Sequence, residues 1–283
     1  MRTVIRLVRF FKPHLGEVLL SILMGVATIT AGIGLLGTSA YLIAAAALHP
    51  SIAELQVAIV GVRFFGLSRA VFRYLERLTA HDITLRLLAK WRVWFYQALE
   101  PLAPARLWRY HSGDLLNRAI SDVGILENFY VRAVAPPLTA LLVAAAGTAF
   151  LSSFAAPLGL ALLAFLTLGG VVLPLGLHCM ARYPGRELVQ ARSAMNTLLV
   201  DGIQGLPDLL VCGQSGAYLK RIAQAGQRLA QPQAMLNRLS AAQSALHGLI
   251  AQSGMLAVLV LAIPLVASGR LNGVWLGALM LAA

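Results

Sequence analysis

The sequence predicts an all-α membrane protein that crosses the bilayer several times, and two observations support this prediction. Only 12% of the 283 residues are charged and 59% are hydrophobic, whereas a soluble domain usually has about 25% charged residues. The charges are also segregated, because residues 18–53, 133–181 and 239–269 contain no Asp, Glu, Lys or Arg. A bilayer-spanning helix needs roughly 20 apolar residues, so these stretches have room for one, two and one spans respectively.

Six spans are expected in order along the chain. They lie at about 18–48, 52–73, 133–151, 158–178, 241–266 and 273–283, with tight turns at 49–51, 152–157 and 268–272. The last apolar stretch has only about eleven residues, which is too short to cross a bilayer. We therefore expect the sequence to stop inside a truncated sixth span.

Two long polar segments separate the pairs of spans, and each is expected to be helical. In the first segment, residues 75–99 consist mainly of good helix formers. Pro101 and Pro104 are expected to end this helix, and Ser112 or Asp114 can cap the next one. This segment therefore predicts two helices joined by a short connecting piece.

The second polar segment repeats this pattern. A helix is expected at about 187–200, and another resumes near Tyr218 and continues into the fifth span. The residues expected to interrupt the helix are Gly202, Gly205, Pro207, Gly213 and Gly216. The similar order of elements in the two segments is a weak internal repeat.

Basic residues gather on one side of the expected membrane domain. The two polar segments carry nine and seven Lys and Arg residues, the N-terminal segment carries four, and the short turns carry only Arg270. The positive-inside tendency then places the polar segments and the N-terminus in the cytoplasm. Residues 1–14 are expected to form a basic amphipathic helix before a retained span. Anionic membrane lipids, not nucleic acid, are the expected partner of this charge.

The second span contains the strongest candidates for a functional site. Arg63 lies near mid-bilayer, where a charge is costly unless it faces a cavity or a partner. It either contacts an anion in a pocket or pairs with a polar group of another span. His81 follows Arg63 by 18 residues, about five helical turns, and Arg77 lies one turn before His81 on nearly the same face. Arg69 lies elsewhere around the helix and is a weaker candidate.

The order of spans, short turns and long helical hairpins resembles the six-span transmembrane domain of ABC exporters (type I exporters, also called type IV). Residues 112–118 and 122–123 resemble the first coupling region of that family, and residues 202–205 and 212–213 resemble the second. The resemblance implies two coupling helices that dock on nucleotide-binding domains. Their candidate residues are Arg106 and Tyr110 in the first region, and Gly205, Pro207 and Asp208 in the second.

A narrower resemblance lies in residues 62–69, 73–78 and 81–82 and continues through 102–105 and Tyr110. These residues are similar to those of the CydC subunits of CydDC thiol-reductant ABC exporters. The resemblance implies a multi-pass protein of the bacterial inner membrane that forms a heterodimer with a CydD-like subunit. It also implies ATP-driven export of glutathione or cysteine from the cytoplasm to the periplasm, and support of cytochrome bd assembly.

The same resemblance implies a bound b-type haem. His81 is then the ligand of the haem iron and Arg77 contacts a haem propionate. Arg63 and Arg69 contact either the substrate or a propionate. A second axial ligand is expected in the part of the sixth span that lies beyond this chain.

One departure from the family pattern limits what this chain does alone. It contains no glycine-rich phosphate-binding loop and no ABC signature. We therefore expect a nucleotide-binding domain, with its ATP and Mg²⁺, beyond residue 283, and no ATP hydrolysis by residues 1–283 themselves. Two other interpretations stay open: an ABC exporter half for lipid or peptide without haem, and a membrane assembly subunit without transport. Arg63 argues against a groove that holds only lipid.

Overall fold

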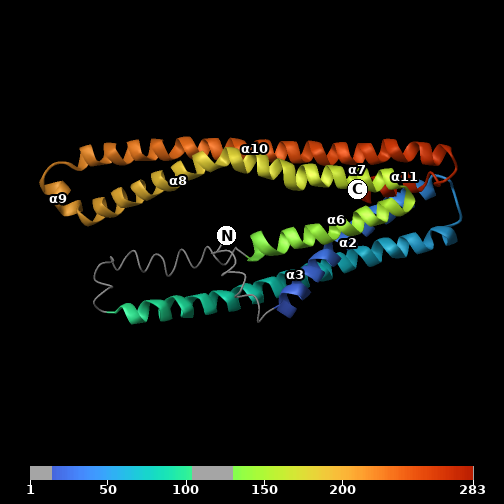
Figure 1. Ribbon diagram of the computed structural model, residues 1–283, viewed down its shortest axis with the longest axis horizontal. Helices are drawn as coiled ribbons and strands as arrows, with labels where there is room; N and C mark the ends of the chain where they lie inside the picture. The colour runs from blue at the N-terminus through green and yellow to red at the C-terminus, as the bar shows by residue number, and fades with distance from the viewer. Residues whose placement is uncertain (1–14, 104–129, 283) are drawn as a thin grey trace. The chain divides into compact units, whose positions relative to one another are not determined.

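The computed structural model describes residues 15–103 and 130–282, and these ranges are helical with no strand. Five described helical runs are long and apolar enough to cross a membrane (Figure 1). They are Leu15–Ala46, Ile52–Leu102, Ala135–Phe154, Ala156–Gln204 and Ser215–Ala267. These runs contain the first five expected spans, so the predicted all-α transmembrane fold class is confirmed. The described part of the expected sixth span is the eight-residue helix α11 (Trp275–Ala282).

The chain divides into two compact units. The first comprises residues 1–160 and 258–283, and the second comprises residues 161–257. The first unit is built around α2 (Leu15–Ala46) and α3 (Ile52–Leu99). His49 has a φ of 54° in the turn between these helices, a left-handed conformation that histidine adopts more readily than most residues. This turn reverses the chain so that α3 packs along α2.

Small residues let the neighbouring helices approach α2 closely. A Cβ atom placed on Gly34 would lie 2.8 Å from the Phe65 ring of α3, and one on Gly25 would lie 3.2 Å from Thr139 Oγ1 of α6 (Ala135–Phe154). Helix α11 also contacts α2. Helix interfaces in membranes are enriched in such small residues because lipid provides little hydrophobic driving force between helices.

Helix α3 joins the expected second span and the expected polar helix into one uninterrupted helix of 48 residues. At 1.5 Å per residue it is about 72 Å long, much longer than the roughly 30 Å of a bilayer core. It passes into a short 3₁₀ turn at Glu100–Leu102, where Pro101 removes a backbone donor. The predicted end at Pro101 is therefore confirmed.

The best-packed core of the first unit lies beyond the apolar part of α3. It joins the start of α2, the polar half of α3, and a π-helical turn at Tyr130–Val134 that precedes α6. Its buried residues are Val18, Ile22, Ile83, Leu87, Leu88, Trp91 and Tyr130. This cluster fixes the extension of α3 relative to α2.

The turn expected at 152–157 is present but much shorter, because a single extended residue separates the two helices. Helix α6 continues to Phe154, Ala155 is extended, and α7 (Ala156–Thr167) begins at the next residue. Ser153 stays in the helix by donating to the Phe150 carbonyl. Pro157 lies in the first turn of α7, where a missing backbone donor costs nothing. Serine and proline here mark helix ends, not a loop.

The second unit is a long helical hairpin. Helix α8 (Leu173–Gln204) follows a π-helical turn at Leu168–Val172, α9 (Leu206–Val211) lies at the tip, and α10 (Ser215–Ala267) returns (Figure 1). Tyr218 of α10 donates a 2.7 Å hydrogen bond to the Leu198 carbonyl of α8.

The expected interruptions of this hairpin are only partly correct. Helix α8 runs through Gly202, and α10 includes Gly216. Only Gly205, at the end of α8, and Gly213, with a φ of 64°, separate helices. A glycine inside a helix costs only about 1 kcal/mol. Glycine is required at position 202, because a Cβ atom there would lie 2.5 Å from the Tyr218 ring.

Several expectations fall on residues 1–14 and 104–129, outside the described residues. They are the N-terminal amphipathic helix, the first coupling region with Arg106 and Tyr110, and the motif at 112–123.

Candidate functional site on helix α3

Arg63, Arg77 and His81 lie on one face of α3, as their spacing predicted. Because α3 has no break between Ile52 and Leu99, the 18 residues from Arg63 to His81 correspond to five full turns and about 27 Å along the axis. All three side chains are exposed in this chain. Arg63 has no carboxylate within ion-pair distance among the described residues. The face therefore presents two cations and an imidazole to whatever lies beside α3.

An apolar strip lies between Arg63 and His81 on this face. Leu67, Tyr74 and His81 are seven residues apart, so they lie within a narrow sector of the helix. Leu67 is 71% exposed and Tyr74 is 66% exposed. Leu78 adds a further exposed side chain beside Arg77. A ligand with an apolar body and anionic groups fits this sequence of side chains.

Arg69 lies apart from that face. Its Cδ and Nε atoms are each 3.7 Å from the position that a Cβ on Gly32 would occupy. Its side chain therefore runs over the glycine surface of α2. The structure brings Arg63, Arg77 and His81 onto one face and leaves Arg69 at the seam between α2 and α3.

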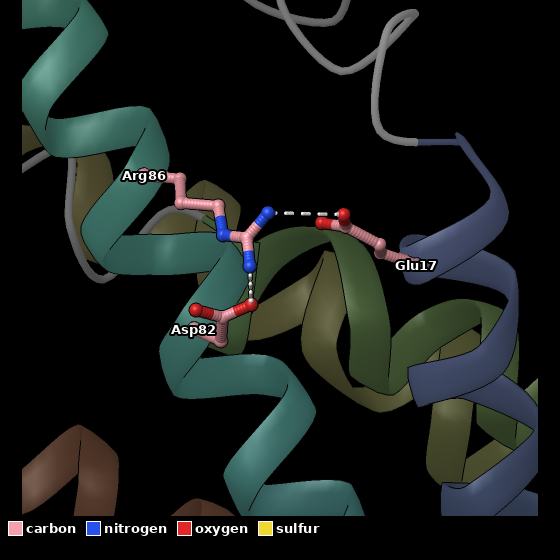
Figure 2. Close-up of polar contacts among 3 residues, drawn as sticks. All are labelled: Glu17, Asp82 and Arg86. Atoms are coloured by element: carbon pink, nitrogen blue, oxygen red, sulfur yellow. Dashed lines mark hydrogen bonds and ion pairs between the residues drawn. The ribbon is translucent and has the colours of Figure 1, made fainter.

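An ion-paired cluster lies directly beside His81. Figure 2 shows Arg86 of α3 between two carboxylates, with Nη2 2.8 Å from Asp82 Oδ2 and Nη1 3.3 Å from Glu17 Oε1 of α2. The three side chains are about half exposed, so water screens these pairs. Their effect is geometric, because Arg86 links α2 to the turn of α3 that follows His81.

A buried polar cluster lies where α2, α3 and the π-helical turn before α6 pack together. Tyr130 is fully buried, and burial raises the pKa of its phenol, while a hydrogen bond with Ser21 opposes this shift and the Glu76 charge adds to it. Glu76 Oε1 also lies 3.6 Å from the position of a Cβ on Gly25. The carboxylate next to Arg77 in sequence therefore faces the helix packing, while Arg77 faces outward.

Comparison with known proteins places the whole chain in one family. No protein-family model matches the chain. It is 32% identical over 270 residues to the glutathione/L-cysteine transport system ATP-binding/permease protein CydC of Haemophilus influenzae, and 31% identical over 287 residues to CydC of Escherichia coli. These matches cover 90% and 96% of the chain. The chain is a CydC-like ABC exporter membrane subunit.

A CydD relative supports the same family at lower coverage. The CydC-like chain is 31% identical over 211 residues, 74% of its length, to the glutathione/L-cysteine transport system ATP-binding/permease protein CydD of Bacillus subtilis. It covers 45% and 48% of the two CydC relatives. The chain thus spans about half the length of the curated relatives that it matches.

The residues expected to form the second coupling region lie at the tip of the hairpin. Gly205 ends α8, Pro207 occupies the first turn of α9, and Asp208 lies in the same turn. Leu210 and Val211 are exposed on this short helix, Val211 by 89%. Helix α9 therefore presents apolar side chains and one carboxylate at the end of two long helices.

Some residues of the candidate site had no clear signal in the CydC-like sequence. Glu17 and Arg86 are 69 positions apart, so no local spacing joins them. Leu67 and Tyr74 could have been found from the sequence, because the seven-residue spacing of Leu67, Tyr74 and His81 places them on one face of a helix. Among the described residues, no group of three or more His, Cys, Asp and Glu side chains could hold a metal ion.

Proposed function

We propose that this chain is the membrane part of one subunit of an ATP-driven exporter that moves glutathione or cysteine from the cytoplasm to the periplasm. The CydC and CydD relatives are named for glutathione and L-cysteine transport. The observation that supports this proposal best is the exposed Arg63 on α3.

Arg63 lies eleven residues after the first residue of α3, about 17 Å along the axis. This is near the middle of a bilayer about 30 Å thick. A charge at this depth is costly and usually faces a water-filled cavity or a partner. Both proposed substrates have carboxylates, which the planar guanidinium group binds through two parallel hydrogen bonds.

The rest of the transporter comes from outside residues 1–283 in this proposal. The relatives are named ATP-binding/permease proteins, and the chain matches about half of each. ATP and Mg²⁺ then bind in a nucleotide-binding domain that follows this chain. Helix α9, with Gly205, Pro207 and Asp208, docks on that domain or on its counterpart. A CydD-like subunit completes a heterodimer in the bacterial inner membrane, with the N-terminus in the cytoplasm.

Haem binding and support of cytochrome bd assembly are also part of the proposal. The α3 face fits haem in chemical type, because His81 offers an imidazole, Arg77 offers a propionate contact one turn away, and the exposed Tyr74 offers an aromatic surface. Haem bound there would supply a redox-active iron. The 27 Å between Arg63 and His81 is too long for one haem to contact both. Arg63 therefore serves the substrate, not a propionate.

The test is ATP-dependent uptake of labelled glutathione and cysteine by inside-out vesicles that contain the full-length heterodimer. We expect Arg63→Gln to lower kcat/KM by roughly 10- to 100-fold, because a charge-assisted hydrogen bond is worth about 1.5–3 kcal/mol. Arg63→Lys should recover part of this loss because it keeps the charge. Arg73→Gln, about 15 Å along the same helix from Arg63 and about 80° around it, is the matched control and should transport normally.

Two outcomes would contradict the proposal. If the wild-type complex hydrolyses ATP but moves neither thiol, the chain belongs to an exporter of another substrate or to an assembly complex. If both thiols are transported and Arg63→Gln transports them normally, the thiol exporter stands and Arg63 is not its substrate contact.

A further inference from the structure

A basic stripe runs along α8 in the second unit. His178, Arg182 and Arg186 are spaced by four residues, so they lie on one side of the helix, and all three are exposed. They line a shallow cavity of about 480 Å³. The cavity is completed by Ala181, Gly185, Val189 and Gln190. The small side chains between the basic residues leave space at the helix surface, where a Cβ on Gly185 would meet no atom within 4 Å.

The stripe begins where the apolar part of the chain ends. No charged residue occurs from 133 to 181, so Arg182 is the first charge after two spans. Leu175 lies one turn before the stripe on the same face and is 60% exposed. The exposed surface of α8 therefore changes along one face from apolar to basic. A bilayer changes in the same order, from acyl chains to headgroups.

The stripe contains only positive charge. The nearest carboxylate on α8, Glu187, lies about 100° around the helix from Arg186, where it lines a neighbouring groove with Arg221 and Arg228 of α10. The other acidic residue of α8, Asp201, is 15 positions beyond Arg186. Neither carboxylate of α8 lines the cavity that Arg182 and Arg186 share.

We propose that His178, Arg182 and Arg186 form a binding site for the phosphodiester headgroup of an anionic phospholipid. The lipid lies in the leaflet on the side of the long helical extensions. The two guanidinium groups each offer a planar pair of donors to phosphate oxygens, and His178 offers a ring N–H. Leu175 packs against the start of an acyl chain. The site lies within the second unit and holds whether or not the protein exports thiols.

Native mass spectrometry of the purified full-length heterodimer tests the site, with phosphatidylglycerol as the probe and phosphatidylcholine as its neutral counterpart. We expect the double variant Arg182→Gln/Arg186→Gln to bind phosphatidylglycerol roughly 30-fold more weakly, about fivefold for each arginine. Phosphatidylcholine binding should stay unchanged. The double variant with lysine at both positions should keep most of the affinity because it keeps both charges.

Arg192→Gln is the matched control. Arg192 is exposed on the same helix, about 80° around it from Arg182 and about 15 Å farther from the apolar stretch. Its loss should leave lipid binding within about twofold of wild type, because headgroup attraction falls within a Debye length of the membrane surface. Equal loss in this control and the double variant would mean that charge alone, not this site, attracts the lipid.

Three further outcomes would overturn the proposal. Unchanged phosphatidylglycerol binding in the glutamine double variant would remove the site. Equally tight binding of phosphatidylcholine would remove the phosphate-charge recognition. Displacement of phosphatidylglycerol by millimolar inorganic phosphate or glutathione would identify a site for soluble anions. All the substituted side chains are exposed, and thermal unfolding of each variant checks that the complex stays folded.

Discussion

His81 and Arg77 lie one turn apart on the exposed face of α3, whereas the residues that follow His81 form ion pairs. His81 is exposed, whereas Asp82 is engaged by Arg86. The pair Arg86–Glu17 then ties this turn to α2. A ligand on His81 would therefore bind beside a turn of α3 that Arg86 links to α2.

The haem proposal predicts a loss of absorbance. In the full-length heterodimer reconstituted with haem, we expect His81→Ala to lose most of the Soret band, because the imidazole would bind the iron directly. Arg77→Gln should keep the band and weaken haem retention, since only a propionate contact is lost.

His247→Ala is the control for this measurement, because His247 is exposed on α10 in the second unit. It should leave the band unchanged. A normal Soret band in His81→Ala would exclude His81 as the iron ligand, while the thiol exporter would remain open.

The common face of Arg63, Arg77 and His81 could be predicted from sequence because α3 is a single helix, so spacing alone sets the direction of each side chain. The contact between Glu17 and Arg86 could not be predicted, since it depends on how α2 packs against α3. The packing of Arg69 over Gly32 depends on the same interface. Positions within one helix follow from its period, whereas positions across an interface need the tertiary fold.

At the scale of elements, the tip of the hairpin depends on two glycines with different roles. Gly213 has a φ of 64°, a conformation that costs other residues about 1–2 kcal/mol. Gly202 is helical, and it makes room for the Tyr218 ring, whose hydroxyl is bonded to Leu198. Gly213 forms the connection between α9 and α10. Gly202 lets α8 and α10 approach each other closely beside this tip.

Gly202→Ala is expected to destabilise this tip. The new Cβ would lie 2.5 Å from Tyr218 Cε1, and such overpacking typically costs about 1–3 kcal/mol. Hydrogen–deuterium exchange of the full-length complex should therefore show faster exchange of α9 and the adjacent turns. Gly226→Ala is the matched control, because a Cβ there meets no atom within 4 Å and alanine favours the helix. Equal exchange in the two variants would show that the Tyr218 contact does not hold the tip.

The ends of helices could be predicted where the sequence changes from apolar to polar. They were harder to predict where a single residue determines whether a helix ends. Four of the first five spans follow from stretches without charge, since a bilayer imposes length and polarity together. The second span, at 52–73, is apolar but contains charged residues such as Arg63. The interruptions expected at Gly202 and Gly216 are wrong, because both residues lie within helices and a glycine there costs only about 1 kcal/mol. The turn expected at 152–157 is shorter in the structure because one extended residue, Ala155, is enough to separate α6 from α7.

At the scale of the molecule, the uneven distribution of basic residues predicts which side of the membrane each turn occupies. Both cysteines, Cys179 and Cys212, are free and exposed. Cys212 follows α9 directly, on the side of the long extensions. The turn between α10 and α11 lies at the other end of the α10 helix and contains the exposed Ser268. Labelling at Cys212 and labelling at position 268 are therefore two independent measurements of the orientation of the chain in the membrane.

A maleimide that does not cross membranes should label Cys212 in inside-out vesicles and not in right-side-out vesicles, when Cys179→Ser is used as the background. Ser268→Cys, in a chain that also carries Cys212→Ser, should give the reverse pattern. Mass spectrometry of the labelled chain distinguishes label on this chain from label on cysteines of the partner subunit. Labelling of Cys212 from the periplasmic side would overturn the proposed cytoplasmic N-terminus.

The unbroken α3 helix also has a mechanical consequence. A rod about 72 Å long without a hinge cannot bend locally to absorb a displacement at one end. Any movement of the polar end, near Leu99, must therefore appear as a tilt or a rotation of the whole rod. A tilt moves Arg63 and His81 by different amounts because they lie at different distances from the pivot, and a rotation turns both through the same angle. Helix α3 is thus suited to act as a lever that changes both positions in a single stroke.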